Sequence, residues 1–192
     1  MTDDPADGYF GESLAARYDE TTAHLSEPAV LEPAVDFLAE RAGKGPVLEL
    51  GVGTGRVALP LAARGIPVHG IELSRAMVAR LRAKPGGDAI GITIGDFATA
   101  EAEGTFTLAY LPRNTIMNLT TQAAQVACFH FRAIDGSIHL QSIPFRYVWP
   151  AELDLMAEVA GLVLSERWSG WEGQPFTNES REHVSVWEKP RS

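Results

Sequence analysis

The sequence has few of the residues that several specialised classes of protein need. Only one of its 192 residues is a cysteine, Cys128, so no internal disulfide can form and no cysteine cluster is available for zinc. We therefore expect a reducing, cytoplasmic location and no bound metal. Basic residues are also scarce, because 16 Lys and Arg stand against 25 Asp and Glu, for a net charge of −9. Nucleic-acid binding usually needs a basic surface, so this charge argues against it.

Long apolar runs are missing as well. No stretch reaches the length of a membrane span, and the first residues are acidic where a secretory signal would be basic. We expect no membrane partner. The hydrophobic content of 45% is nevertheless ample for a sizeable core, so we expect one domain over residues 1–192.

The first part of the chain alternates between helix and strand patterns. Ser26 is a predicted cap for a helix over Ser26–Arg41, and Gly43 is its predicted end. Short apolar runs alternate with two further helices, the second of which Ser74 is expected to cap. The predicted strands are Pro46–Leu50, Pro67–Leu73, Ala89–Ile94 and Phe106–Leu111, and the helices between them are Arg56–Arg64 and 74–85. This order predicts an α/β fold with a mostly parallel sheet and helices on both faces.

The remainder follows a different pattern. A helix is predicted over Thr121–Phe131, followed by a long extended segment over Ser137–Trp149. Pro150 is expected to open another helix, which Gly161 ends. The strands Leu162–Trp168 and His183–Glu188 are predicted to form an antiparallel pair at the end of the sheet.

The loop after the first predicted strand contains three glycines in alternation, at Gly51, Gly53 and Gly55. Glycines allow a sharp turn and a close approach of backbone to ligand. A dinucleotide fingerprint would have its third glycine where this chain has Arg56. Glu49, before the loop, is poorly placed beside a pyrophosphate but suits a ligand with an ammonium group. These differences favour S-adenosylmethionine over NAD as the ligand.

Two further carboxylates follow later strands. Glu72 ends the second strand, where an α/β nucleotide fold places the acid that binds both ribose hydroxyls, although a solvated strand-end glutamate is the alternative. Asp96, after the third strand, can accept a hydrogen bond from an adenine amine, with Phe97 beside the base. Leu73 and Met77 can form the opposite wall, and for Met77 ordinary core packing is an equal alternative.

These motifs, in this order, resemble those of class I S-adenosylmethionine methyltransferases, in particular the bacterial small-molecule subgroup. The segment 15–19 is similar to the family's N-terminal segment, in which a tyrosine often lies over the cofactor. The resemblance implies a Rossmann-like methyltransferase fold with an antiparallel final strand and a small β lid. It also implies S-adenosyl-L-methionine as cofactor and S-adenosyl-L-homocysteine as product. The implied cofactor-binding residues are Tyr18, Glu49, Gly51, Gly53, Gly55, Arg56, Glu72, Leu73, Met77, Asp96, Phe97 and Leu111.

Within one domain, the resemblance divides the chain into four parts. They are an N-terminal helical cap (1–45), a cofactor-binding half (46–131), a lid strand (132–150) and a C-terminal helix with an antiparallel strand pair (150–192). One departure from the family is that no clear fifth strand follows the helix predicted before residue 132. Either Ser137–Phe145 replaces that strand, or a segment is missing near 130–134. The second explanation is favoured, because parallel strands need a crossover for which this sequence leaves no room.

Methyl transfer from a sulfonium is an in-line displacement, so positioning can supply much of the catalysis. Asn114 lies where related enzymes approach the methyl group, and His139 is a candidate general base. The predicted function is methyl transfer to nitrogen or oxygen of a small-molecule acceptor, such as an amino sugar or another secondary metabolite. The alternatives are a catalytically silent module that binds cofactor or a partner and, less favoured, an NAD-dependent oxidoreductase. A homodimer is compatible with each of these three functions.

Overall fold

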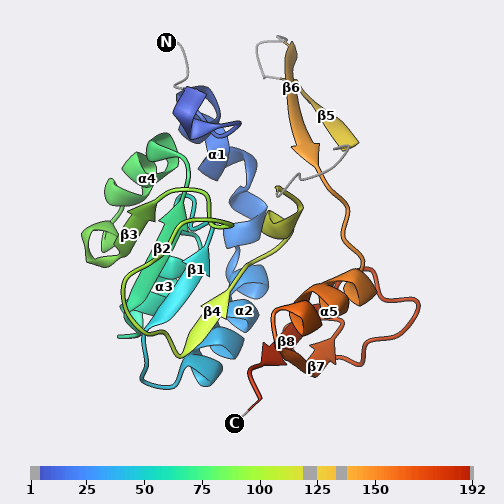
Figure 1. Ribbon diagram of the computed structural model, residues 1–192. Coiled ribbons are helices and arrows are strands. Elements are labelled where there is room, and N and C mark those ends of the chain that lie inside the picture. The colour runs from blue at the N-terminus through green and yellow to red at the C-terminus, as the bar shows by residue number, and fades with distance from the viewer. Residues whose placement is uncertain (1–4, 119–124, 133–137, 191–192) are drawn as a thin grey trace. The chain divides into compact units, whose positions relative to one another are not determined.

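The computed structural model describes residues 5–118, 125–132 and 138–190 of the chain (Figure 1). The chain divides into two compact units, Met1–Leu119 and Thr120–Ser192. No helix in the described ranges is both long and apolar enough to cross a membrane.

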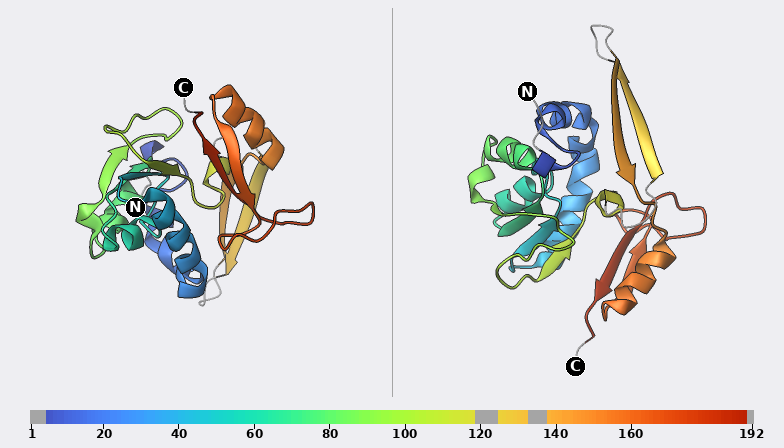
Figure 2. Two further views of the ribbon diagram at one scale, coloured as in Figure 1. Left: turned by 90° about the horizontal axis from the view of Figure 1, so that it is seen from below. Right: turned by 45° about the horizontal axis from the view of Figure 1, so that its top comes forward.

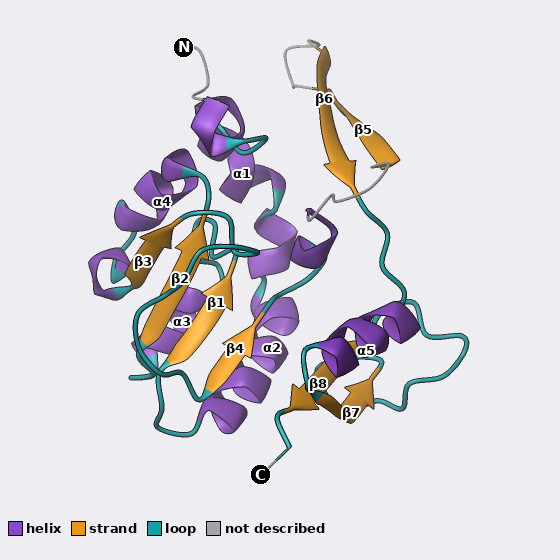
Figure 3. Ribbon diagram, in the orientation of Figure 1, coloured by secondary structure: helices purple, strands orange, loops and turns teal. Residues whose placement is uncertain are grey.

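The first unit is built on a four-stranded parallel sheet. Its strands are β1 (Val47–Leu50), β2 (Val68–Glu72), β3 (Gly91–Ile94) and β4 (Leu108–Tyr110), in the order β3-β2-β1-β4 (Figure 3). Val47 lies opposite both Val68 and Leu108, so the strands are in close register. Because all four are parallel, the loops after their carboxyl ends meet at one edge of the sheet. The predicted parallel sheet is confirmed.

Helices and 3-10 turns cover this sheet. They are η1 (Pro5–Asp7), α1 (Glu12–Thr21), η2 (Ala23–Ser26), α2 (Pro28–Ala42), α3 (Ala58–Ala63), α4 (Arg75–Arg82), η3 (Gly87–Ala89) and η4 (Thr115–Asn118). α2 and α3 lie behind the sheet in the view of Figure 3. The core between them consists of small and branched apolar side chains, among them Val35, Leu38, Val47, Val57 and Leu61.

The helix ends agree with the sequence analysis in part. Ser74 caps α4 as predicted, because its Oγ accepts a hydrogen bond of 3.0 Å from Met77 N. Gly43 ends α2 with φ of 59°. Ser26 does not cap α2, because it belongs to η2 and Pro28 starts the helix two residues later. α1 lies in the part of the chain that the resemblance implied to be an N-terminal helical cap, before the helix predicted over Ser26–Arg41.

The second unit corrects one prediction directly. In place of the helix expected over Thr121–Phe131, residues Gln125–Arg132 form strand β5, which pairs antiparallel with β6 (Ile138–Phe145) in a two-stranded sheet (Figure 2). The stretch contains Val126, Phe129 and Phe131, residue types that favour strands, and β6 supplies a partner along its whole length. The extended segment predicted after Ser137 is confirmed by β6.

The same pairing decides part of the fifth-strand question. β6 pairs with β5 and does not join the parallel sheet, so Ser137–Phe145 does not replace a fifth strand there. The other explanation, a segment missing near residues 130–134, stays a prediction, because residues 133–137 lie outside the described ranges.

The C-terminal helix and strands form as predicted. α5 (Pro150–Val159) is followed by β7 (Val163–Trp168) and β8 (Val184–Glu188), which pair antiparallel. This pair is a separate sheet and not the last strands of the parallel one. Among the described residues, no parallel strand lies beside β4 on its outer side to continue the ladder.

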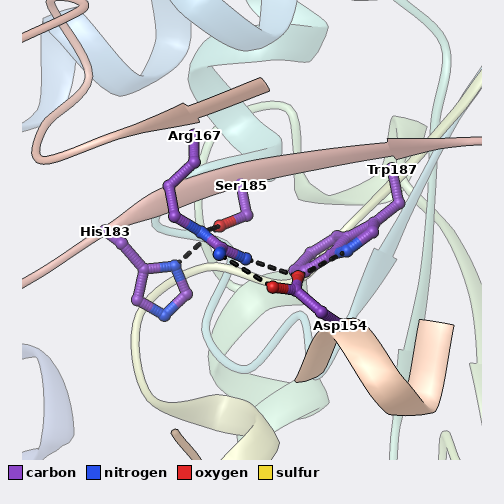
Figure 4. A network of polar contacts seen from close by, with 5 residues as sticks. All are labelled: Asp154, Arg167, His183, Ser185 and Trp187. Atoms are coloured by element: carbon purple, nitrogen blue, oxygen red, sulfur yellow. Dashed lines mark hydrogen bonds and ion pairs between the residues drawn. The ribbon is translucent and has the colours of Figure 1, made fainter. Parts of the chain in front are cut away.

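A polar network ties α5 to this strand pair (Figure 4). Arg167 on β7 donates from Nη1 and Nη2 to the two carboxylate oxygens of Asp154 on α5, at 2.9 and 2.6 Å, and Trp187 Nε1 donates to Oδ1 at 3.1 Å. Arg167 Nε also donates to Ser185 Oγ at 2.9 Å, which leaves the Ser185 hydroxyl proton free to point at His183 Nδ1, 2.8 Å away. Hydrogen bonds from Arg167 lower the pKa of Asp154.

We expect Asp154→Asn to lower the free energy of unfolding by about 1–2 kcal/mol, because it weakens a bidentate, charge-assisted contact. Since the pKa of Asp154 is lower in the folded state, the stabilisation is complete above the ordinary value of 3.8 and disappears as pH falls through the folded value. Urea unfolding at several pH values measures this difference. Glu158→Gln, on the exposed side of the same helix, is the control, and an equal loss in both variants contradicts the assignment.

Candidate functional site

The glycine loop adopts the backbone conformation that its residues predict. Gly51, Gly53 and Gly55 have φ values of 75°, 55° and 84°, in the left-handed region that side chains disfavour. A Cβ on Gly53 would meet no atom within 4 Å, whereas a Cβ on Gly51 would lie 2.6 Å from the Thr115 side chain. The loop is therefore packed from below at Gly51 and open to a ligand at Gly53.

Glu72 holds this loop in place. Its Oε2 accepts a hydrogen bond of 2.8 Å from Gly53 N, and its Oε1 accepts one of 3.0 Å from Ser74 N. The side chain is 8% exposed, so Glu72 is not a solvated strand-end residue. Burial raises its pKa, and the backbone hydrogen bonds oppose that shift. Each carboxylate oxygen keeps a lone pair with which to accept from a ribose hydroxyl.

Glu49 lies deeper, beneath the loop. It is 2% exposed, and its Oε2 accepts a hydrogen bond of 2.8 Å from the Tyr110 hydroxyl on the neighbouring strand. Burial raises the pKa of Glu49 to about 8, while the hydrogen bond from Tyr110 and the charge of Arg56 oppose the rise. Burial also raises the pKa of Tyr110. Glu49 is thus a largely protonated group near neutral pH.

The N-terminal strap, defined as residues 5–22, packs against α4 and the glycine loop. The Asp7 carboxylate, 5% exposed, accepts from Arg75 N at 2.7 Å and Ala76 N at 3.4 Å, which satisfies the first amides of α4. Ser74 Oγ donates to the Phe10 carbonyl at 2.5 Å. The far end of the strap reaches the loop through Asp19, which accepts from Thr54 Oγ1 at 2.5 Å and pairs with Lys84 at 2.6 Å.

This strap brings Tyr18 to the predicted cofactor residues. Its ring contacts Phe10 edge-on, with ring centroids 6.3 Å apart. Burial raises the pKa of the Tyr18 hydroxyl, and the charges of Arg56, Glu72 and Arg113 all act on it. Tyr18 therefore stays protonated as a hydrogen-bond donor beside three charged groups from three loops.

The residues predicted to bind the adenine differ in how exposed they are. Asp96 is exposed and accepts a hydrogen bond of 2.9 Å from Ala98 N, which closes its own turn but leaves its second oxygen available. Leu73 is 42% exposed, and Phe97 is half-buried. Met77 is 1% exposed in a cluster with Ala15 and Ala76, an arrangement that favours its core-packing alternative.

The loop after β4 contains Leu111, which is half-buried, and the catalytic candidate Asn114, whose carbonyl accepts from Met117 N at 2.9 Å. Thr115 in the same loop touches the glycine loop at Gly51, so Asn114 belongs to this edge of the sheet. His139, the other catalytic candidate, is on β6 opposite Phe131, in the second unit. Its side chain lies outside the described residues, and its role stays a prediction.

This arrangement fits S-adenosylmethionine. The open backbone at Gly53 can approach the ligand, and the two Glu72 oxygens suit a diol. Among the described residues, no group of three or more His, Cys, Asp or Glu side chains could hold a metal ion.

Comparisons with known proteins agree. Residues 47–134 match the family described as a methyltransferase domain. The solved structure of the CcbJ methyltransferase from Streptomyces caelestis is 30% identical, with a TM-score of 0.82, over 96% of this chain and 99% of that one. The chain belongs to the class I S-adenosylmethionine-dependent methyltransferases.

Two more distant structures share the fold. A TehB-like methyltransferase from Corynebacterium glutamicum is 20% identical, with a TM-score of 0.70, over 93% of this chain and 99% of that one. The glycopeptide N-methyltransferase MtfA, solved with S-adenosylmethionine, is 17% identical, with a TM-score of 0.62, over 82% and 86%. No curated protein sequence matches the chain significantly. The methyltransferase uses S-adenosylmethionine as its cofactor, and the NAD-dependent alternative is not supported.

Sequence reasoning missed several residues that shape this site. Tyr110 lies opposite Glu49 on the neighbouring strand β4, a pairing that no local sequence pattern predicts. Asp7 stands too far from α4 in sequence for any local pattern to connect them. Thr115 fills a space that only the folded loop creates at Gly51.

We expect the stability of the ligand-free enzyme to fall as pH rises through the window set by Glu49. The folded state keeps a proton up to about pH 8, whereas the unfolded chain loses it near 4.5, so each rise in pH within that window favours unfolding. The loss is on the order of 2–4 kcal/mol. Glu49→Gln, which keeps an acceptor for Tyr110, should flatten the profile in urea unfolding between pH 5 and 8. Parallel profiles for both proteins contradict this assignment.

We expect Asp7→Ala to release the bound demethylated cofactor faster, by about 5-fold or more, because the N-terminal strap loses its two hydrogen bonds to α4. Stopped-flow displacement measures the rate, and thermal unfolding should show a loss of about 1 kcal/mol. Asp36→Ala removes an exposed acidic residue on α2 and serves as control. An unchanged release rate in Asp7→Ala, with the same stability loss, shows that the strap does not limit release.

Proposed function

We propose that this methyltransferase acts on nitrogen or oxygen of a small-molecule acceptor, such as an amino sugar or another secondary metabolite. The observation that carries the proposal is the open backbone at Gly53, which the buried Glu72 carboxylate holds in place at the edge of the sheet. The chain's similarity to a glycopeptide N-methyltransferase supports a small-molecule acceptor as well.

The chain's residues have separable tasks in this reaction. Bound S-adenosylmethionine supplies an electrophilic methyl group on a sulfonium. Glu72 and the glycine loop hold the ribose end, and the loop after β4 presents Asn114 to the acceptor side. Tyr18 covers the site, excludes water and can donate one hydrogen bond. Holding two reactants at attack distance can account for several orders of magnitude in rate without a general base.

The alternative of a catalytically silent module rests on one observation. In the described residues the parallel sheet ends at β4, without the further strands of the family. Such a module would bind S-adenosylmethionine but transfer no methyl group to any acceptor. Turnover with a radiolabelled methyl group across a panel of amines, amino sugars and phenols distinguishes the two functions.

We expect micromolar-range binding of S-adenosylmethionine by the wild type, and a loss of about 100-fold or more in Gly53→Val and Glu72→Ala, measured by calorimetry. The first variant puts a side chain into the open space above the loop, and the second removes the ribose acceptor. Gly65→Val is a matched control, because Gly65 also has a positive φ and no atom within 4 Å of a Cβ. Unchanged titrations in both site variants overturn the assigned site.

A further inference from the structure

Arg113 has an unusual backbone conformation. Its φ of 58° is the only positive value for a residue other than glycine among the described residues. This region is disfavoured by side chains, and residues that occupy it often lie at functional sites. The side chain is exposed, and the residue is the third after β4, in the loop at the carboxyl edge of the sheet.

The loop that contains Arg113 is fixed against the glycine loop. Thr115 fills the space beside Gly51, and its Oγ1 donates a hydrogen bond of 2.8 Å to the Pro112 carbonyl, which locks the turn on both sides of Arg113. The strained residue therefore has a defined place over the site and is not a loosely held loop residue.

Within the part of the chain that the structure describes, no side chain neutralises the positive charge of Arg113. No described residue forms an ion pair or side-chain hydrogen bond with Arg113. Burial lowers the pKa of Arg56, and the charge of Arg113 lowers it further, while both guanidinium groups act on the Tyr18 hydroxyl. The acidic group that acts on Arg56 is Glu49, which is buried under the loop. The two guanidinium groups thus give this part of the site a positive charge, which favours the binding of an anion.

We propose that Arg113, with the Tyr18 hydroxyl, binds an anionic group, a carboxylate or a phosphate, on the methyl acceptor. The inference rests on the proposed function and narrows its acceptor to one that bears a negative charge. A guanidinium matches both anions because its planar set of N–H donors can bind two oxygens at once.

Two sources of such an anion exist in the reaction, since the cofactor itself has a carboxylate. Arg56 is the partly buried member of the pair, adjoins the glycine loop and belongs to the expected cofactor set. Arg113 is the exposed member and precedes the catalytic candidate Asn114 in the loop after β4. The cofactor carboxylate is thus assigned to Arg56 and the acceptor's anion to Arg113.

Calorimetry on the protein saturated with S-adenosylhomocysteine tests this assignment, with benzoate and its neutral counterpart benzamide as probes. We expect the wild type to bind benzoate about 10-fold more tightly than benzamide, and Arg113→Gln to lose that preference. Arg113→Lys should keep part of it, because the charge remains. Arg181→Gln, which removes an exposed arginine from the second unit, should leave it unchanged.

A second variant separates charge from folding. Arg113→Gly relieves the backbone strain and should raise the thermal midpoint while abolishing the benzoate preference. Affinity for S-adenosylhomocysteine should stay within about 2-fold in both Arg113→Gln and Arg113→Gly, and should fall in Arg56→Gln.

Three results overturn the inference. They are equal binding of benzoate and benzamide by the wild type, an unchanged preference in Arg113→Gln, or weaker S-adenosylhomocysteine binding in Arg113→Gln, which would assign Arg113 to the cofactor. Failure of the wild type to bind S-adenosylhomocysteine at all would instead contradict the cofactor site.

Discussion

The carboxylate of Glu72 is the contact on which the site depends. It accepts one backbone hydrogen bond from the glycine loop and another from the residue that caps α4. One side chain at the end of β2 thereby fixes the loop after β1 and the start of the next helix. Because the carboxylate is buried, losing either hydrogen bond would leave a poorly solvated acceptor, which is costly.

The N-terminal strap is attached at the same helix start, that of α4. Ser74 caps α4 and donates to Phe10, while Asp7 receives the next two amides of the helix. Tyr18 reaches the glycine loop only because these contacts, and that of Asp19 with Thr54, anchor both ends of the strap. At the cofactor edge of the sheet, three buried acidic or hydroxyl side chains thus accept hydrogen bonds from successive backbone amides.

Much of the fold could be predicted because its signals are local. Apolar runs of strand length, Ser74 as a cap and glycines at turns each act within a few residues, and they correctly located β1 to β4, α4 and α5. The prediction of a helix over Thr121–Phe131 was wrong because local signals do not decide the structure there. A short apolar run is compatible with helix and strand, and the pairing of β5 with β6 decided between them.

The sequence by itself determined the cofactor class. Glu49, the three alternating glycines, Arg56 and Glu72 can be read directly from the sequence, and these residue types indicate the ligand. Only the tertiary structure decided how Glu49 and Met77 are buried, how Asp7 caps a distant helix, and that Arg113 lies in a strained turn beside Arg56. Burial, hydrogen-bond partners and the charge that a side chain experiences arise from segments far apart in the chain. Those quantities decide which acceptor the site can bind, and they exist only once the loops after parallel strands meet at one edge of the sheet.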